Sequence, residues 1–255
     1  MIDYSAIDLY DDEFEPVITT ITGDAGVGKT LLAGTWPKPI FIRVENGFKV
    51  FDQLPKEQRP AKLPVVDSMQ MLMDQLVWVL KAEHDHRTVV IDSVTQAELL
   101  FSDHVITTDE KGANSLATAN GGYGGGYSAV GALHGRIRQA AKLIAERRKM
   151  HVVFIAHSDV DKIDPPDADP FSRYELALHH KSAPHYVNNV DMVAYVRLET
   201  FVKKGKELGA KGKAISDGTR VAICHTSPAQ VSKNRFGIEE PVVLTKGVCP
   251  FNFIK

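Results

Sequence analysis

The stretch Gly23-Asp24-Ala25-Gly26-Val27-Gly28-Lys29-Thr30 decides the fold of this 255-residue chain. It fits the phosphate-binding pattern G-x-x-x-x-G-K-[ST], in which glycines allow backbone N–H groups to turn inward around phosphate oxygens. The β-branched residues 16–22 precede it and predict a buried strand, and residues 31–36 predict a short helix that ends before Pro37. A strand, a glycine loop and a helix in this order predict a nucleotide-binding site.

Two residues at the end of the loop have distinct expected roles. We expect Lys29 to reach the β- and γ-phosphates of ATP and Thr30 to hold Mg²⁺ through its hydroxyl. Asp92 ends a later apolar strand, a position where a carboxylate commonly orients Mg²⁺ and its waters. Glu45 also ends a strand, and because the carboxyl ends of neighbouring parallel strands converge on a ligand, its carboxylate is a candidate to polarise the attacking water. The alternative for Glu45 is a salt-bridged surface residue.

Composition narrows the class of protein. The 44% hydrophobic content is enough for a core, and no stretch approaches the roughly 18 consecutive apolar residues of a membrane span. The net charge of −2 means that any nucleic-acid site must be a local patch. Residues 1–15 are acidic and unlike a secretory signal, and Cys224 and Cys249 lack metal-site spacing. We therefore expect a cytoplasmic protein without membrane contact, with residues 16–255 as one domain.

The apolar pattern predicts a mostly parallel β-sheet flanked by helices on both faces. The expected early strands are residues 16–22, 39–45, 88–92 and 152–156. The expected longer helices are one capped by Ser68 and those at residues 96–107 and 128–149. Later strands are expected at residues 190–200, 220–226 and 241–245. Because no helix separates these later strands, we expect the C-terminal edge of the sheet to be antiparallel. Residues 109–127 and 165–184 are expected to be irregular.

Three segments resemble the core of RecA-type recombinases: the phosphate loop, Phe41-Ile42-Arg43-Val44-Glu45 and Val90-Ile91-Asp92-Ser93-Val94. In that family the Glu ending the second strand is the catalytic carboxylate, and the Asp-Ser-Val segment orients Mg²⁺. The resemblance therefore implies these roles for Glu45 and Asp92. His157 ends a strand similar to the one that carries the family's γ-phosphate sensor, which is often Gln. The resemblance implies a sensor at His157; the alternative is a hydrogen-bonded structural histidine.

A further match is Lys233-Asn234-Arg235-Phe236-Gly237, which is identical to the KNRFG motif of RadA-type bacterial recombination ATPases. There the Lys and Arg are thought to reach the nucleotide of a neighbouring subunit. The resemblance implies that Lys233 and Arg235 neutralise charge on the γ-phosphoryl group in trans, so that hydrolysis requires an oligomer. The alternative is an ordinary basic turn between two strands. Without RadA's zinc finger and protease-like domain, the chain most resembles the short phage RecA-like ATPases of single-strand annealing and recombination.

In RecA-like cores two loops face the filament axis, and here they correspond to residues 109–127 and 158–184. Tyr123 and Tyr127 are candidates to stack on bases, and Arg173 and Lys181 to contact phosphates. A flexible lid or plain disorder is the alternative for the first loop. The lysines between two later strands can follow a nucleic-acid backbone or belong to a solvated hairpin: Lys203, Lys204, Lys206, Lys211 and Lys213.

The sequence and its resemblance together predict a Mg²⁺-dependent, RecA-like ATPase that binds single-stranded DNA and promotes annealing or strand exchange in phage recombination. The expected cofactors are ATP and Mg²⁺. The expected partners are single-stranded DNA, further copies of the chain in a ring or filament, and a single-strand binding protein. Two alternatives stay open: a helicase-like motor subunit, and a nucleotide-gated assembly protein or switch that does not bind DNA.

Overall fold

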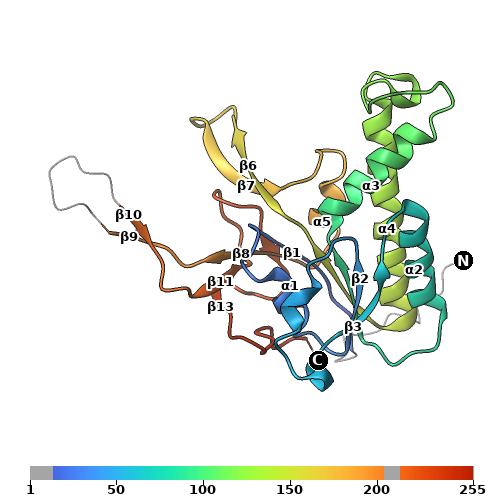
Figure 1. The fold of residues 1–255 in the computed structure, drawn as a ribbon. Coiled ribbons are helices and arrows are strands. Elements are labelled where there is room, and N and C mark those ends of the chain that lie inside the picture. The colour runs from blue at the N-terminus through green and yellow to red at the C-terminus, as the bar shows by residue number, and fades with distance from the viewer. Residues whose placement is uncertain (1–13, 204–212, 255) are drawn as a thin grey trace, which may run out of the picture.

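The structure is a computed structural model that describes residues 14–203 and 213–254 (Figure 1). Its main sheet contains β1 (Ile18–Gly23), β2 (Pro39–Arg43), β3 (Ala61–Val65), β4 (Thr88–Asp92), β5 (His151–Ile155), β8 (Met192–Leu198), β11 (Arg220–Ile223), β12 (Lys233–Asn234) and β13 (Val242–Val243). The strand order is β13-β11-β8-β1-β5-β4-β2-β3, and β12 also pairs with β8. The acidic residues 1–13 lie outside the described part of the chain, so the predicted boundary at residue 15 stays a prediction.

The strands from β8 to β3 in this order run parallel, whereas β11, β12 and β13 are antiparallel to their neighbours. This confirms the predicted mostly parallel sheet with an antiparallel C-terminal edge. Strand β3 was not predicted. It lies at the opposite edge of the sheet, contains Pro64 and leaves Lys62 exposed, so it lacks the continuous apolar run of the central strands.

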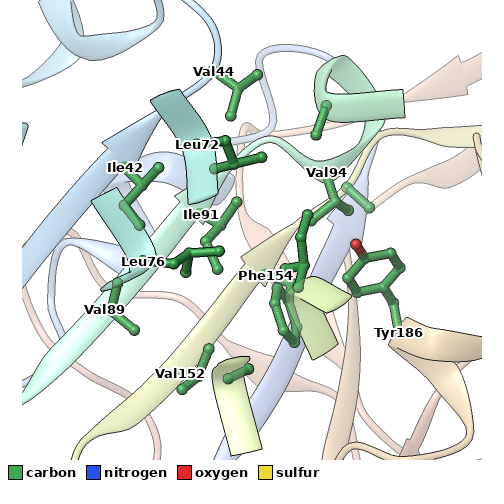
Figure 2. Packing of buried hydrophobic residues seen from close by; sticks show 14 of the residues in the cluster. Ile42, Val44, Leu72, Leu76, Val89, Ile91, Val94, Val152, Phe154 and Tyr186 are labelled. Atoms are coloured by element: carbon green, nitrogen blue, oxygen red, sulfur yellow. The ribbon is translucent and has the colours of Figure 1, made fainter. Parts of the chain in front are cut away.

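Three long helices cover one face of the sheet: α2 (Met69–Lys81), α3 (Val94–Thr107) and α4 (Gly125–Arg148). Ser68 caps α2 as predicted, because its side chain accepts a hydrogen bond from the backbone N–H of Met71. The apolar side of α2, with Leu72 and Leu76, packs against Ile42 and Ile91 of the sheet in a core that Figure 2 shows. Burial of these side chains holds the helices on the sheet.

The opposite face carries much less helix. It is covered by α1 (Lys29–Ala33), by the 3₁₀ turn η2 (Phe48–Phe51) and by residues near the C-terminus such as Phe251. Helices therefore lie on both faces as predicted, but the phosphate-loop face is mostly closed by short segments. A short 3₁₀ turn, η3 (Lys56–Gln58), precedes β3.

Several predicted boundaries were wrong. Helix α1 spans Lys29–Ala33 rather than residues 31–36, and α3 begins at Val94 rather than at residue 96 because Ser93 caps it by accepting from Gln96 N. The loop predicted at 109–127 contains a 3₁₀ turn, η4 (Ala119–Gly121), and ends where α4 begins at Gly125. Glycines at the start of α4 concealed the first residues of this helix, which was predicted to begin at residue 128, since their intrinsic propensity for helix is low.

The segment predicted to be irregular at residues 165–184 contains β7 (Phe171–Leu176), which pairs antiparallel with β6 (Ser158–Ile163). This hairpin projects away from the main sheet (Figure 1). Strand β6 is mostly exposed and β7 is mostly half-buried, so neither has the continuous buried face that reveals a strand in sequence. The short helix α5 (Pro184–Val187) follows. A second hairpin joins β9 (Phe201–Lys203) to β10 (Lys213–Ile215), and the lysines between them lie outside the described residues.

Within the described ranges, no helix is both long and apolar enough to cross a membrane.

Candidate functional site

The phosphate loop joins the end of β1 to the start of α1, and two glycines make its path possible. Gly28 has φ 96°, and Gly23 has φ 143°, conformations that residues with a Cβ rarely adopt. At Gly23 an added Cβ would lie 2.2 Å from the carbonyl oxygen of Val196 in the neighbouring strand β8. The tight packing of the loop against β8 therefore requires glycine at this position.

Lys29 is the first residue of α1, and its side chain turns back into the phosphate loop. Its ammonium donates to the carbonyl oxygens of Gly23 and Asp24 at 2.7 and 2.8 Å. Burial lowers the pKa of Lys29, and the nearby carboxylates of Asp92 and Glu45 act in the opposite direction. The cation is thus held where the loop's backbone N–H groups would receive phosphate oxygens.

Thr30 and Asp92 meet beside the loop, as expected of a magnesium site. The Thr30 hydroxyl donates to Asp92 Oδ2 at 2.8 Å, and Asp92 Oδ1 is buried with no hydrogen-bond partner among the described residues. Burial raises the pKa of Asp92 to about 6. A buried, unpartnered carboxylate oxygen next to a hydroxyl fits Mg²⁺, which proteins bind through one or two carboxylates while phosphates and waters complete the shell. The described residues contain no cluster of three or more His, Cys, Asp or Glu that would bind a metal without a nucleotide.

We expect Asp92→Asn to stabilise the nucleotide-free protein at pH 7 while it abolishes Mg²⁺-dependent hydrolysis. Because burial raises the pKa of this carboxyl from 3.8 to about 6, its ionisation in the folded chain destabilises the protein by about 3 kcal/mol at pH 7. The asparagine carries no charge, and its oxygen still accepts the hydrogen bond from Thr30. Urea unfolding without Mg²⁺ measures the difference in free energy of unfolding.

The pH dependence of this difference has a defined sign. The folded-state pKa of Asp92 is raised, so wild type loses stability as pH rises from about 4 to about 6, whereas Asp92→Asn does not. The advantage of the variant should therefore shrink as pH falls from 7 towards 4. The exposed Asp103→Asn in α3 is the matched control and should show no such dependence. Equal stability of Asp92→Asn and wild type at pH 7 would contradict the burial argument.

Glu45 and His157 face each other across the end of the sheet. His157 Nε2 lies 3.5 Å from Glu45 Oε1, and the His157 backbone N–H donates to the Thr95 hydroxyl at 3.0 Å. The His157 imidazole lowers the pKa of Glu45, while burial acts against it. Glu45 is therefore held as a carboxylate near Asp92, whose backbone oxygen accepts from Glu45 N at 3.3 Å.

These predicted residues line one cavity of about 500 Å³. The lining includes Gly28, Lys29, Thr30, Glu45, Asp92 and His157, together with Gln53, Arg220 and Lys246. The last three were not predicted. A signal for Arg220 existed: it opens an apolar strand expected at an antiparallel edge, and an antiparallel strand begins where its parallel neighbours end, beside the phosphate loop.

Lys233 and Arg235 lie outside this cavity. Lys233 Nζ donates to the backbone oxygen of Asn188 at 2.9 Å, and Arg235 pairs with Asp191 at 2.9 Å. Asp191 also accepts from the backbone N–H of Ile18, at the start of β1 and therefore at the opposite end of this strand from the phosphate loop. These two cations do not line the cavity of their own chain, and their role in a neighbouring subunit stays a prediction.

The predicted DNA-contact residues fall into two groups. The ring of Tyr127 stacks on His179 with centroids 4.6 Å apart, and Lys181 Nζ donates to Ser128 Oγ at 2.7 Å. Tyr123, four positions before Tyr127 in the sequence, is fully exposed. The structure thus brings residues of both predicted loops together at the start of α4. Arg173, in contrast, lies on the β6–β7 hairpin and is paired with Glu175.

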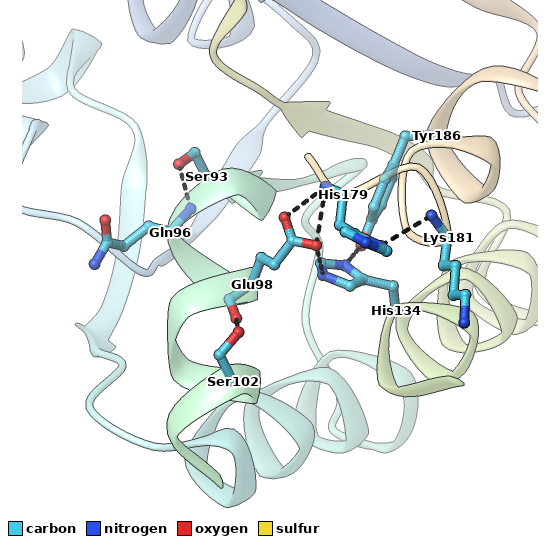
Figure 3. A network of polar contacts seen from close by, with 8 residues as sticks. All are labelled: Ser93, Gln96, Glu98, Ser102, His134, His179, Lys181 and Tyr186. Atoms are coloured by element: carbon cyan, nitrogen blue, oxygen red, sulfur yellow. Dashed lines mark hydrogen bonds and ion pairs between the residues drawn. The ribbon is translucent and has the colours of Figure 1, made fainter. Parts of the chain in front are cut away.

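A buried polar network anchors the second of these loops (Figure 3). Glu98 of α3 accepts from the backbone N–H of His179 at 3.0 and 3.2 Å, and His134 Nδ1 lies 2.7 Å from the Tyr186 hydroxyl. Burial lowers the pKa of His134 to about 3, so this ring is neutral. Tyr186 in turn accepts through its backbone oxygen from Thr20 of β1. The network ties the loop to two helices and to the strand that leads into the phosphate loop.

A parallel sheet with a phosphate loop between its first strand and first helix, and with Asp92 beside Thr30, defines an α/β P-loop NTPase. The sequence model of the AAA domain family matches residues 15–236. Since this match covers most of the chain, the protein belongs to this family and contains an AAA-type P-loop ATPase domain. A comparison with curated proteins found no significant match.

Proposed function

We propose that this protein is a Mg²⁺-dependent ATPase that binds single-stranded DNA as an oligomer and promotes annealing or strand exchange. The observation that carries the ATPase part is the convergence of Lys29, Thr30, Asp92 and Glu45 on one cavity. The DNA part rests on the resemblance to RecA-like recombinases and on the two loops that meet at the start of α4.

Each residue of the cavity has a place in hydrolysis. Lys29 would bind the β- and γ-phosphates, and Thr30 and Asp92 would hold Mg²⁺, which neutralises phosphate charge when bound. Glu45 would take a proton from the attacking water. The water oxygen bonds to the γ-phosphorus while the bond between the γ-phosphorus and the bridging oxygen of the β-phosphate breaks. ADP, phosphate and a protonated Glu45 result, and the proton then returns to solvent.

His157 would hold Glu45 in its ionised form and respond to the γ-phosphate. Its backbone oxygen accepts from Ala177 N at 2.8 Å, so its position is joined directly to the chain leading to His179. Lys233 and Arg235 would complete the site of an adjoining subunit, which makes turnover depend on assembly.

The DNA-contact surface that we propose consists of Tyr123, Tyr127, His179 and Lys181. Aromatic side chains give sequence-tolerant stacking with bases, and Lys181 adds a positive charge at the same place. Arg173, on the hairpin, is a further candidate contact. A helicase-like motor would use the same cavity but would have to move along a strand.

We expect single-stranded DNA to stimulate ATP hydrolysis, and the rate to rise more than linearly with protein concentration. The measurement is steady-state hydrolysis with Mg²⁺, with and without an oligonucleotide, at several protein concentrations. Tyr123→Ala should reduce the stimulation without lowering the rate in the absence of DNA, because this exposed ring is remote in sequence from the phosphate loop and lines none of its cavity. Val77→Ala, an exposed apolar residue of α2 outside both loops, is the control.

Hydrolysis that is indifferent to DNA at every protein concentration would contradict the DNA part of the proposal. It would instead favour a nucleotide-gated assembly protein, in which ATP orders subunits without a nucleic-acid partner. ATP-driven movement along the strand would instead favour the motor.

A further inference from the structure

Arg220 opens β11 and lies against the phosphate loop. An added Cβ at Gly28 would be 3.6 Å from Arg220 Cδ and 3.7 Å from Nε and Nη1. The antiparallel pairing of β11 with β8 sets this position, because Arg220 is opposite Leu198 at the carboxyl end of β8. The backbone is held on its other side as well, where Arg220 O accepts from Leu244 N at 2.9 Å.

The guanidinium has no partner within the described residues. Its Nε is buried without a hydrogen bond, and no carboxylate in this part of the chain forms an ion pair with it. This contrasts with Lys246 in the same cavity, whose ammonium donates to Gln53. A buried arginine donor left unpaired costs free energy, because it has lost its hydrogen bonds to water. The planar guanidinium is suited to carboxylates and phosphates. The position therefore fits an anionic ligand.

The neighbouring cavities indicate which part of a nucleotide is in reach. Arg220 lines both the large cavity with Lys29 and Thr30 and a small adjoining one of about 40 Å³ lined by Leu31 and Thr35. The residues of hydrolysis, Glu45, Asp92 and His157, line the large cavity alone. Arg220 therefore borders the large cavity and also extends past the hydrolytic residues towards Leu31 and Thr35 beside the loop.

We propose that Arg220 binds, within its own chain, the α- and β-phosphates that ATP and ADP share. The inference rests on the nucleotide site of the proposed function and adds a binding residue to it. Unlike Lys233 and Arg235, which would act on a neighbour, Arg220 serves the cavity that it lines. Its contact is made in both nucleotide states, so it supports affinity more than the chemical step.

The test is the affinity of Arg220→Gln for ADP and for a non-hydrolysable ATP analogue, each with Mg²⁺, measured by calorimetric titration. Glutamine keeps the first two methylene groups of the arginine side chain and removes the charge. We expect both nucleotides to bind about 10- to 100-fold more weakly, the loss typical of a charge-assisted hydrogen bond. The control is Arg197→Gln, an exposed arginine of β8 outside the cavity, which should bind as wild type does.

Unchanged affinity for both nucleotides would overturn the proposal, and so would a loss confined to the ATP analogue, which would place Arg220 at the γ-phosphate. If Arg220→Gln does not fold, Arg220→Met tests the same point, because methionine fills a similar volume without a charge or an N–H donor. It should weaken binding of ADP and the analogue alike, and wild-type affinity for either would overturn the inference. Lys29→Ala distinguishes failure of the proposed function from failure of this inference. If Lys29→Ala binds ADP normally, the nucleotide site itself is wrong. If Lys29→Ala loses ADP binding while Arg220→Gln binds normally, only the inference about Arg220 is removed.

Discussion

Lys29→Ala should abolish ATP hydrolysis and weaken nucleotide binding by at least about 100-fold. The side chain supplies a cation that is bonded to the loop's own carbonyls, at Gly23 and Asp24, and is held where the β- and γ-phosphates are expected. Binding is measured by titration with ADP and a non-hydrolysable ATP analogue, and turnover by phosphate release. Both readouts should fall together, because Lys29 would contact phosphate in the bound and the reacting states.

The fold of this variant needs a separate measurement, since it leaves two carbonyl oxygens without their donor. Thermal unfolding without nucleotide should still show a cooperative transition, at a somewhat lower temperature than that of wild type, because the buried carbonyl of Gly23 loses this donor. Lys81→Ala, an exposed lysine in the last turn of α2, is the matched control and should retain both binding and turnover. An unchanged rate in Lys29→Ala would remove the central claim that this loop binds the substrate.

Glu45→Gln should bind ATP with nearly wild-type affinity and hydrolyse it about 10²- to 10⁴-fold more slowly. Glutamine has the shape of glutamate but no carboxylate to accept the proton of the attacking water. The position beside His157 and Asp92 is retained, so the loss should appear in kcat rather than in nucleotide affinity. Single-turnover phosphate release and a binding titration separate the two quantities.

The acid limb of the pH profile adds an independent readout. The His157 imidazole lowers the pKa of Glu45, so His157→Ala should raise that pKa and move the acid limb of the rate profile to higher pH. Glu240→Gln, at an exposed position away from the cavity, is the control and should leave both rate and profile unchanged. Normal hydrolysis by Glu45→Gln would show that another group takes the proton.

Much of the fold could be predicted because its central strands are buried on both faces. Strand β4 shows this, because Thr88 and the apolar residues Val89, Val90 and Ile91 are completely buried. A continuous apolar run of this kind can be recognised without knowing which strands lie beside it. The exposed hairpin of β6 and β7 and the edge strand β3 were missed for the opposite reason. Their residues alternate or remain in solvent, so their pairing depends on partners distant in sequence or on turn geometry.

In the candidate site, too, some residues could be predicted from local sequence and others could not. Lys29 and Thr30 belong to one local motif whose spacing carries the chemistry. Asp92 ends one strand that the apolar pattern locates, and Glu45 follows another by two residues. Arg220 is more than 190 positions further along the chain than the loop it touches, and only the antiparallel pairing of β11 with β8 brings it there. The contact of Tyr127 with His179 likewise joins two loops that the sequence keeps apart.

The sequence by itself therefore determined the class of the protein, the phosphate loop and the strand ends that carry Asp92 and Glu45. These features depend on backbone conformation and burial, which neighbouring residues specify locally. The tertiary structure alone decided which distant side chains share the cavity, that Lys233 and Arg235 lie outside it, and that Arg220 faces the loop. These outcomes depend on strand order and direction, which come from the packing of the whole sheet rather than from any one segment.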